Sequence, residues 1–206
     1  MNHIDSLATL SRKTLASALS CPAKNSLGKN RAPLAVDCTA GNGHDTLFLA
    51  ERCGPSGHVW AFDVQQTALD TTEKRLHDAG LAERVTLIPY GHEELESYLP
   101  ATAAGNIQAA VFNLGFLPGS DQKTVTQART TLIALNMLAI LLAPRGVLCV
   151  HCYTGHPGGK DEGEAVAAWF AALPWKLWRV ASYAMVNKQV NAETLFLAER
   201  RQCTAE

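Results

Sequence analysis

Short buried strands and amphipathic helices alternate along most of this sequence, and that alternation restricts the fold more than any other feature. It predicts parallel strands with helices packed on both faces of one sheet. The last two predicted strands are joined only by residues 187–193, which is too short for a crossover, so these two strands must be antiparallel. The predicted strands are 34–36, 58–62, 85–89, 107–112, 146–153, 175–186 and 194–199, and the predicted helices are 4–19, 44–53, 67–79, 124–142 and 162–173.

Composition agrees with one globular domain that carries a short extension. The chain has 206 residues, of which 47% are apolar, enough for a full core. Residues 1–32 read as a helix and a linker, and residues 33–206 as the main domain. No apolar run is long enough to span a membrane, and no secretory signal is visible, so we expect a cytoplasmic protein without a membrane partner.

The charge balance excludes a protein that holds nucleic acid by bulk charge alone. Eighteen basic residues against 19 acidic ones give a net charge of −1, so a nucleic-acid partner must meet a local patch. Residues 1–32 are basic and the remainder is acidic. We expect the N-terminal helix to cap the fold. An RNA-facing helix and a targeting segment are the alternatives.

The turn after the first predicted strand is the most informative stretch, Asp37-Cys-Thr-Ala-Gly-Asn-Gly-His-Asp45. Gly41 and Gly43 allow a tight turn whose backbone lies close to a ligand. A dinucleotide fingerprint would need a third glycine at Thr46, and the Asp37 carboxylate would repel a pyrophosphate but attract a cationic amine. The turn therefore favours S-adenosylmethionine (SAM), which has an ammonium, a sulfonium and no phosphate. A turn that only caps the helix is the alternative.

A second acid, Asp63, ends the second predicted strand, 22 residues after Gly41. A carboxylate there can accept hydrogen bonds from both ribose hydroxyls of an adenosine cofactor. Two acids around a glycine turn thus fit an adenosyl amino acid better than a dinucleotide. His92 and Glu93 follow the third strand, and we expect them to contact the adenine; a solvated helix start is the alternative.

The fourth predicted strand leads into Asn113-Leu-Gly-Phe-Leu-Pro-Gly119. Ligands of doubly wound sheets bind beyond the carboxyl ends of the strands, so this segment should face the cofactor. The Asn113 side-chain oxygen and a neighbouring carbonyl can accept two hydrogen bonds from an amine and aim its lone pair at a methyl group. The segment resembles the Asn/Asp-Pro-Pro-aromatic motif of amine methyltransferases, with Leu114-Gly115 in place of the prolines. An asparagine that only closes the strand is the alternative.

The fifth predicted strand and its loop supply candidate proton acceptors. An alkyl ammonium must lose a proton before its nitrogen can attack. His151 and Tyr153 share one face of the strand, and His156 lies in the glycine-rich loop beyond it. Any of the three can accept or relay the proton, and a purely structural role is equally open for each.

The cysteine pattern argues against a metal or redox site. Cys149 and Cys152 form a Cys-x-x-Cys, but their odd spacing on a strand directs them to opposite faces. No second Cys/His pair at metal-ligand spacing accompanies them. We therefore expect reduced thiols and no metal.

Four motifs, at residues 37–46, 91–93, 113–119 and 155–159, together resemble those of a known family. They are similar to the YtqB-type (MnmM) family, once labelled rRNA methylases and now understood as tRNA 5-(aminomethyl)-2-thiouridine methyltransferases. The resemblance covers roughly residues 34–199. It implies a seven-stranded class I SAM methyltransferase (Rossmann-like) fold with an antiparallel last strand, often in a homodimer. It also implies methylation of the aminomethyl nitrogen on the wobble uridine of the tRNA anticodon.

The resemblance also implies roles for individual residues, and it requires no metal because the sulfonium is already an activated leaving group. Asn113 with Gly115 places the amine for in-line attack, and Phe116, a Tyr in many members, stacks on the flipped base. The residues expected to bind SAM are Asp37, Thr39, Ala40, Gly41, Asn42, Gly43, Asp45, Asp63, Gln65, His92, Glu93 and Asn113. Those expected to contact the substrate are Phe116, Pro118, Gly119, His156 and Lys160.

Two other functions remain open at this point. A methyltransferase of rRNA or of a small amine would use the same site, and the near-neutral charge is compatible with a small substrate. A SAM-binding or dinucleotide-binding module without catalysis would share the glycine turn but have no turnover.

Overall fold

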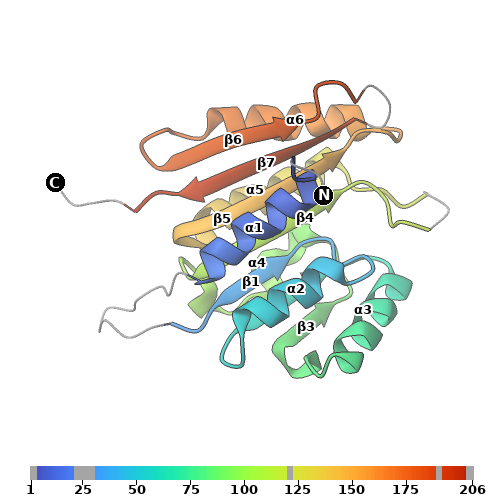
Figure 1. The fold of residues 1–206 in the computed structure, drawn as a ribbon, viewed down its shortest axis with the longest axis vertical. Coiled ribbons are helices and arrows are strands. Elements are labelled where there is room, and N and C mark those ends of the chain that lie inside the picture. The colour runs from blue at the N-terminus through green and yellow to red at the C-terminus, as the bar shows by residue number, and fades with distance from the viewer. Residues whose placement is uncertain (1–3, 21–30, 120–122, 189–191, 203–206) are drawn as a thin grey trace.

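The structure is a computed structural model that describes residues 4–20, 31–119, 123–188 and 192–202. Most of the predicted linker between the first helix and the first strand lies outside these residues. In the described part, one seven-stranded sheet runs through the molecule with helices on both sides (Figure 1).

The sheet has the strand order β3-β2-β1-β4-β5-β7-β6. The first five strands are mutually parallel, whereas β7 lies antiparallel between β5 and β6. This confirms the predicted class I methyltransferase topology, including the antiparallel end of the sheet. The strands are β1 (Leu34–Asp37), β2 (His58–Phe62), β3 (Val85–Ile88), β4 (Ile107–Leu114), β5 (Leu142–Tyr153), β6 (Trp178–Ala184) and β7 (Glu193–Arg200).

Helices cover both faces because the parallel strands are apolar on both sides. One group of helices, with α1 and α2 in front in Figure 1, packs on one face, and the other group lies behind the sheet. The first group is α1 (Leu7–Ser20), α2 (His44–Cys53) and α3 (Gln66–Asp78), and the second is α4 (Leu95–Tyr98), α5 (Ala128–Leu141) and α6 (Gly159–Ala172). The described residues also form short 3-10 helices. One precedes β3, namely η1 (Ala82–Arg84), and two lie between β3 and β4, namely η2 (His92–Glu94) and η3 (Ala101–Ala103).

The N-terminal helix α1 contributes directly to the core. Leu7, Leu15 and Leu19 are buried in one cluster with side chains of β4 and β5, including Val111 and Cys149. Burying a leucine contributes about 1.5–3 kcal/mol, so three of them anchor the helix firmly. The helix therefore lies over β4, β5 and β7.

Several predicted boundaries differ from the structure, each for a local reason. The first helix begins at Leu7 instead of residue 4, because the Ser6 hydroxyl accepts the Thr9 N–H as a cap. The predicted helix 124–142 was wrong in its first turn: Val125 forms an antiparallel bridge with Phe116, and α5 starts only at Ala128.

Other boundaries move by a few residues. The fourth strand continues past residue 112 to Leu114, so Asn113 lies on the strand and not in a loop. The fifth strand starts at Leu142, the last helix starts at Gly159, and the penultimate strand is confined to residues 178–184.

The alternation of side chains along β4 and β5 decides which residues meet. Cys149 faces the α1 side of the sheet and Cys152 the α5 side, which confirms their predicted separation. By the same alternation, Asn113 on β4 and His151 on β5 are register partners on the α1 side. The candidate residues of these two strands therefore share one face and one end of the sheet.

Candidate active site

Two adjoining cavities open at the carboxyl ends of the parallel strands. The first, which we call the β2–β4 cavity, has a volume of about 380 Å³ and extends from the ends of β2 and β3 toward β4 and residues 124–127. The second, which we call the α1 cavity, has a volume of about 550 Å³ and lies beside the N-terminal helix. Both volumes are in the usual range for small-molecule sites. The residues that line both cavities are Thr39, Gly41, Asn113, Phe116 and Pro118.

The glycine turn is held by contacts that leave little freedom. Gly43 has a φ of 77°, and a Cβ there would lie 2.8 Å from the Thr72 hydroxyl oxygen and 2.9 Å from the Thr72 Cα. Only glycine satisfies both the backbone conformation and this packing. The Thr72 hydroxyl also donates to the Gly41 carbonyl at 3.0 Å, so α3 supports the turn from behind. Gly43 thus shapes the turn without lining either cavity.

Asp63 connects the turn to the end of β2. One carboxylate oxygen accepts the Gly41 N–H and the other accepts the Gln65 N–H, both at 2.9 Å. Asp63, singled out for its position after the strand, and Gln65, assigned through the family resemblance, both line the β2–β4 cavity. The aromatic ring of Tyr90 and the exposed Val64 side chain line the same cavity and provide apolar wall.

Asp37 does not face a ligand directly, and this corrects the idea that its carboxylate meets the amine. Its side chain is fully buried, and its two oxygens accept the Thr39 N–H at 3.1 Å and the Thr46 hydroxyl at 2.7 Å. Burial, reinforced by the neighbouring Asp45 and Asp63 carboxylates, raises the pKa of Asp37 to about 7, against the opposing effect of the two hydrogen bonds. Asp37 therefore contributes to the site by stabilising the conformation of the glycine turn through these two hydrogen bonds.

The carboxylate that does reach the α1 cavity is Asp45, on the first turn of α2. Its Oδ2 accepts the Asn113 side-chain N–H at 2.9 Å. Its Oδ1 accepts the guanidinium of Arg12 from α1 at 2.8 Å. Because the amide nitrogen of Asn113 is engaged by Asp45, its amide oxygen is the atom left to accept a hydrogen bond from a ligand. The Asn113 backbone N–H donates to the Thr39 hydroxyl at 2.7 Å, which ties β4 to the glycine turn.

One wall of the β2–β4 cavity contains a buried histidine that contacts the start of the glycine turn. His92 lines the β2–β4 cavity, and its Nδ1 is 3.0 Å from the Cys38 carbonyl oxygen. Burial lowers the pKa of His92, so the ring is neutral and Nδ1 is the donor. Glu93, the next residue, also lines this cavity. The positions of both residues are therefore compatible with the predicted contact to adenine.

A buried carboxylate supports the far side of the same cavity. Glu162 of α6 is 3% exposed and accepts the hydroxyls of Thr126 at 2.6 Å and Thr131 at 2.7 Å. The Thr131 hydroxyl oxygen is also 3.4 Å from the His92 Nε2. Residues 124–127, which the sequence predicts to be the first turn of a helix, instead line the β2–β4 cavity, and Glu162 holds them through Thr126.

A chain of hydrogen bonds lies at the end of β5. The Tyr153 hydroxyl oxygen is 3.1 Å from the His151 Nδ1, and the His151 Nε2 is 2.8 Å from the Glu193 Oε2. Tyr153 lines the α1 cavity, whereas the His151 side chain is 4% exposed. The rings stack with centroids 4.2 Å apart, which confirms that His151 and Tyr153 share a face.

The third candidate base, His156, is buried against the glycine-rich loop. Its Nδ1 is 3.0 Å from the Pro157 carbonyl oxygen, and its Nε2 is buried without a hydrogen-bond partner among the described residues. A Cβ at Gly159 would lie 2.7 Å from that Nε2, and one at Gly115 would lie 3.7 Å from it. The ring meets Phe116 edge to face at 6.0 Å. His156 therefore packs beneath the residues that line the cavities.

The remaining predicted residues divide into two groups. Ala40, Asn42 and Pro118 line the α1 cavity, where the Asn42 amide donates to the Pro118 carbonyl at 3.4 Å. Gly119 is exposed, and Lys160 lies on the surface of α6 with its ammonium 3.8 Å from Glu164. The structure therefore does not place these last two residues among those that line the two cavities.

Sequence reasoning missed two polar residues that complete the site. Arg12 comes from α1, whose basic residues we noted without assigning them a contact. Glu193 begins β7, and only the pairing of β7 with β5 places it opposite Tyr153. A prediction that the last strand pairs with β5 as well as with β6 would have located Glu193.

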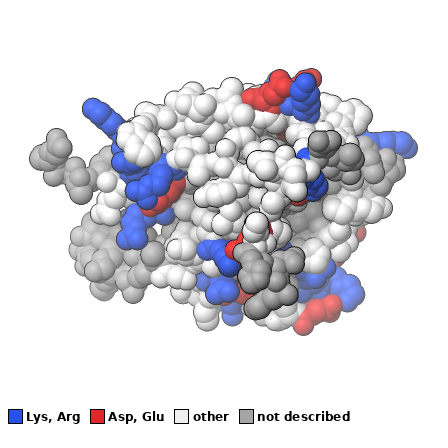
Figure 2. All heavy atoms as spheres, turned by 45° about the horizontal axis from the view of Figure 1, so that its top comes forward, with Lys and Arg blue, Asp and Glu red and all other residues white. Residues whose placement is uncertain are grey.

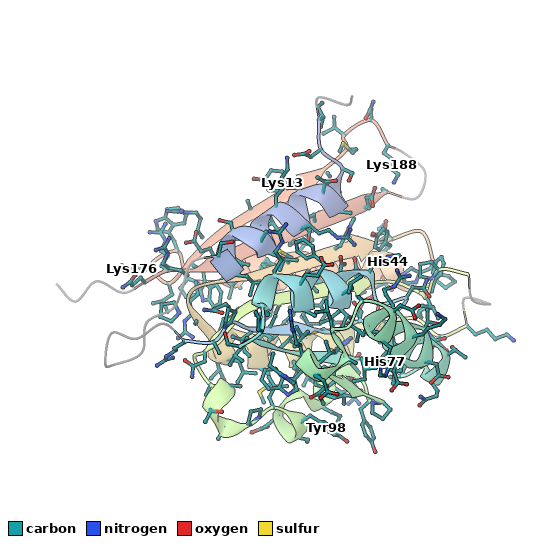
Figure 3. The ribbon with its side chains drawn as sticks, turned by 60° about the horizontal axis from the view of Figure 1, so that its bottom comes forward. Lys13, His44, His77, Tyr98, Lys176 and Lys188 are labelled. Carbon is teal, nitrogen blue, oxygen red and sulfur yellow. The ribbon has the colours of Figure 1, made fainter. Side chains whose placement is uncertain are left out.

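Charges of both signs occur on the face of the molecule shown in Figure 2. On the face shown in Figure 2, basic and acidic side chains are interspersed with uncharged surface. His44 and Lys188 both lie toward the right of the view in Figure 3, and His44 lines the α1 cavity. In the described part of the chain, no group of three or more potential metal ligands is close enough to hold an ion. No described helix is long and apolar enough to cross a membrane.

Comparison with known proteins places this geometry in a family. The model of the family described as "Putative rRNA methylase" matches residues 59–199. The chain belongs to this family. The assignment confirms the predicted resemblance.

Three relatives extend the family assignment. The chain is 34% identical over 173 residues to the protein named "tRNA (mnm(5)s(2)U34)-methyltransferase, chloroplastic" from Arabidopsis thaliana, with 80% of this chain and 62% of that protein covered. This chain thus spans less than two thirds of that relative.

Two solved structures match over nearly their whole length at 31% identity. The one described as a "putative rRNA-methylase" from Clostridium thermocellum has a TM-score of 0.85 and covers 97% of this chain and 100% of its own. The one described as SMU.1697c, a "putative methyltransferase" from Streptococcus mutans in complex with SAH, has a TM-score of 0.80 and covers 96% and 99%.

Proposed function

We propose that this protein is a SAM-dependent N-methyltransferase that acts on the aminomethyl group of the wobble uridine in tRNA. The observation that carries the proposal is the orientation of Asn113 at the junction of the two cavities. Asp45 holds its amide nitrogen, so its oxygen can accept an N–H from an amine. The relative from Arabidopsis, named for methylation of this nucleoside, supports the choice of substrate.

The residues of the cavities fit SAM on their own chemistry. The Asp63 carboxylate lies where a ribose diol would need an acceptor, and Tyr90 and Val64 give an apolar wall for adenine. The Asp45 carboxylate offers an acceptor to an ammonium group near the glycine turn. The structural relative in complex with SAH supports this assignment. When bound, SAM supplies a methyl group that is already activated by the sulfonium.

The protein's own contribution is to hold and orient the attacking amine. Asn113 can accept one amine N–H, and the second must be met by a neighbouring acceptor so that the lone pair points along the methyl–sulfur axis. Such alignment of two reactants is worth several kcal/mol of the barrier. Phe116 lines both cavities and provides a ring on which an extruded base can stack.

Two further features belong to the proposal. We infer that the protein works in a reducing compartment, the cytoplasm, because the four described cysteines are free thiols. We also infer a homodimer, as the family resemblance implies. Sedimentation of the purified full chain tests the second inference, and a monomer at micromolar concentration would refute it.

The test of the activity is methyl transfer to defined tRNA. Purified protein with labelled SAM should methylate a tRNA that bears the aminomethyl group and leave the same transcript without that group unlabelled. Asn113→Ala should abolish turnover while SAM affinity measured by calorimetry stays within about twofold, since Asn113 aims the substrate. Asn136→Ala, a matched change on the exposed side of α5, should change neither.

Three results would contradict the proposal in different ways. Transfer to a small amine or to rRNA, with none to the aminomethyl tRNA, would remove the assigned substrate. SAM binding without any transfer would indicate a sensor. Tight binding of NADH without binding of SAM would overturn the cofactor as well.

A further inference from the structure

We propose that Glu193 is a positioning residue for proton transfer, which fixes His151 so that Tyr153 presents its oxygen to the substrate amine as a hydrogen-bond acceptor. This inference rests on the proposed function and specifies how the amine loses its proton. The three residues come from two antiparallel strands, and Glu193 is the register partner of Tyr153.

The geometry forms one continuous chain from the protein surface to the cavity. Lys188 donates to the Glu193 Oε1 at 2.7 Å, and Glu193 Oε2 lies 2.8 Å from the His151 Nε2. The His151 Nδ1 is 3.1 Å from the Tyr153 hydroxyl oxygen, and Tyr153 lines the α1 cavity. Each link is within hydrogen-bond distance, so both ring nitrogens of His151 are engaged.

The chemical identity of the partners sets the direction of every bond in this chain. An ionised carboxylate only accepts, so the proton of neutral His151 must be on Nε2. The Nδ1 lone pair is then free to accept the Tyr153 O–H. With its hydrogen turned toward His151, the phenol oxygen has only lone pairs left to offer to the cavity. An amine N–H satisfies such an oxygen, whereas a substrate carbonyl does not.

This arrangement also gives the proton a destination. As the substrate N–H bond breaks, its electron pair stays on nitrogen and becomes the lone pair that attacks. That proton passes to the Tyr153 oxygen while the phenol proton passes to the His151 Nδ1. Tyr153 ends unchanged, His151 becomes an imidazolium, and its Nε2–H then points at the Glu193 carboxylate, which stabilises the positive charge.

The charged groups around His151 act in opposite directions on its pKa. Burial lowers the pKa of His151, and so does the Lys188 ammonium. Glu193 opposes burial by its charge and its hydrogen bond, and the Asp45 carboxylate on α2 acts in the same sense. Burial raises the pKa of Tyr153 to about 12, so the phenol stays protonated and able to pass its hydrogen on.

The test is Glu193→Gln, measured as turnover on the aminomethyl tRNA over a range of pH. A glutamine amide can donate as well as accept, so it no longer enforces the tautomer of His151. We expect kcat to fall about tenfold to a hundredfold, the range of a general-base contribution, with the KM for SAM unchanged. Activity requires neutral His151 and therefore rises with pH through its pKa. Because Glu193 raises that pKa, its loss should move the acid limb of kcat to lower pH.

A double-mutant cycle with Tyr153→Phe separates positioning from structural support. In the Tyr153→Phe background the relay is already cut, so Glu193→Gln should cause little further loss of kcat. Glu199→Gln, the same change at the far end of β7, should leave turnover and its pH profile unchanged. Thermal unfolding of each variant checks that β7 still pairs.

The outcomes distinguish this inference from the proposed function. Wild-type protein that cannot methylate the aminomethyl tRNA refutes both. Active wild-type protein together with a Glu193→Gln variant of unchanged kcat and pH profile refutes the role of Glu193 alone. An equal loss in the wild-type and Tyr153→Phe backgrounds also refutes it, because the effect would then not pass through Tyr153.

Discussion

The buried carboxyl of Asp37 makes a quantitative prediction about folding stability. Its pKa is raised from 3.8 to about 7 in the folded protein, chiefly by burial. Between these two values the folded state holds a proton that the unfolded state has released, so the free energy of unfolding falls as pH rises and levels off above about 7. A shift of this size corresponds to about 4 kcal/mol lost across the interval.

Asp37→Asn removes this penalty because the amide is neutral at every pH. Its oxygen can still accept the Thr39 N–H, and its nitrogen can donate to the Thr46 hydroxyl, so both hydrogen bonds have a substitute. We expect the free energy of unfolding of the variant, relative to wild type, to increase by about 4 kcal/mol between pH 4 and pH 8. Denaturant unfolding of both proteins at a series of pH values measures this difference. The contributions of other titrating groups are the same in both proteins and cancel when one free energy is subtracted from the other.

A matched variant shows whether burial is the cause. Asp78→Asn makes the same chemical change on the exposed side of α3, and its relative stability should stay flat over the same range. If the difference between Asp37→Asn and wild type is equally flat, Asp37 ionises normally and the electrostatic reasoning fails.

Two further substitutions test contacts of the site. Arg12→Met removes the ion-pair partner of Asp45, the carboxylate that orients Asn113, so kcat should fall several-fold. Because the Arg12 side chain is 43% exposed, the free energy of unfolding should change by less than about 1 kcal/mol. Lys13→Met, the control, should leave kcat unchanged, and an equally unchanged kcat for Arg12→Met would show that α1 is not coupled to the site. Gly43→Ala should destabilise the chain by more than about 1 kcal/mol, since it adds overlap with Thr72 to the strain of a positive φ. Gly54→Ala has similar strain and no neighbour within 4 Å, so equal melting temperatures for the two variants would refute the overlap.

Much of the fold could be predicted because local patterns and global topology agree. Helix 44–53 and strand 58–62 begin and end where glycines and caps indicate. The first turn of the predicted helix 124–142 could not be placed in this way. Its residues have helical periodicity, but a tertiary bridge between Val125 and Phe116 overrides it.

The candidate site was predictable where a motif follows a strand and unpredictable where partners come from distant segments. Asp63 and Asn113 were located from their place at strand ends. Asp37 was expected in the same way to face the ligand, but nothing in the sequence distinguishes a carboxyl at the mouth of a turn from one folded beneath it. Arg12 and Glu193 have no local signature, since each acquires its role only when its element packs beside β5.

The placement of β7 between β5 and β6 has a consequence for how the enzyme is assembled. Arg12 of the first helix contacts Asp45 on α2, and Glu193 of the last strand contacts His151 on β5. A ribosome-bound chain that has already formed the glycine turn and β4 still lacks the carboxylate that polarises His151. Under the proposed role of Glu193, competence for methyl transfer therefore comes only when the final hairpin has formed.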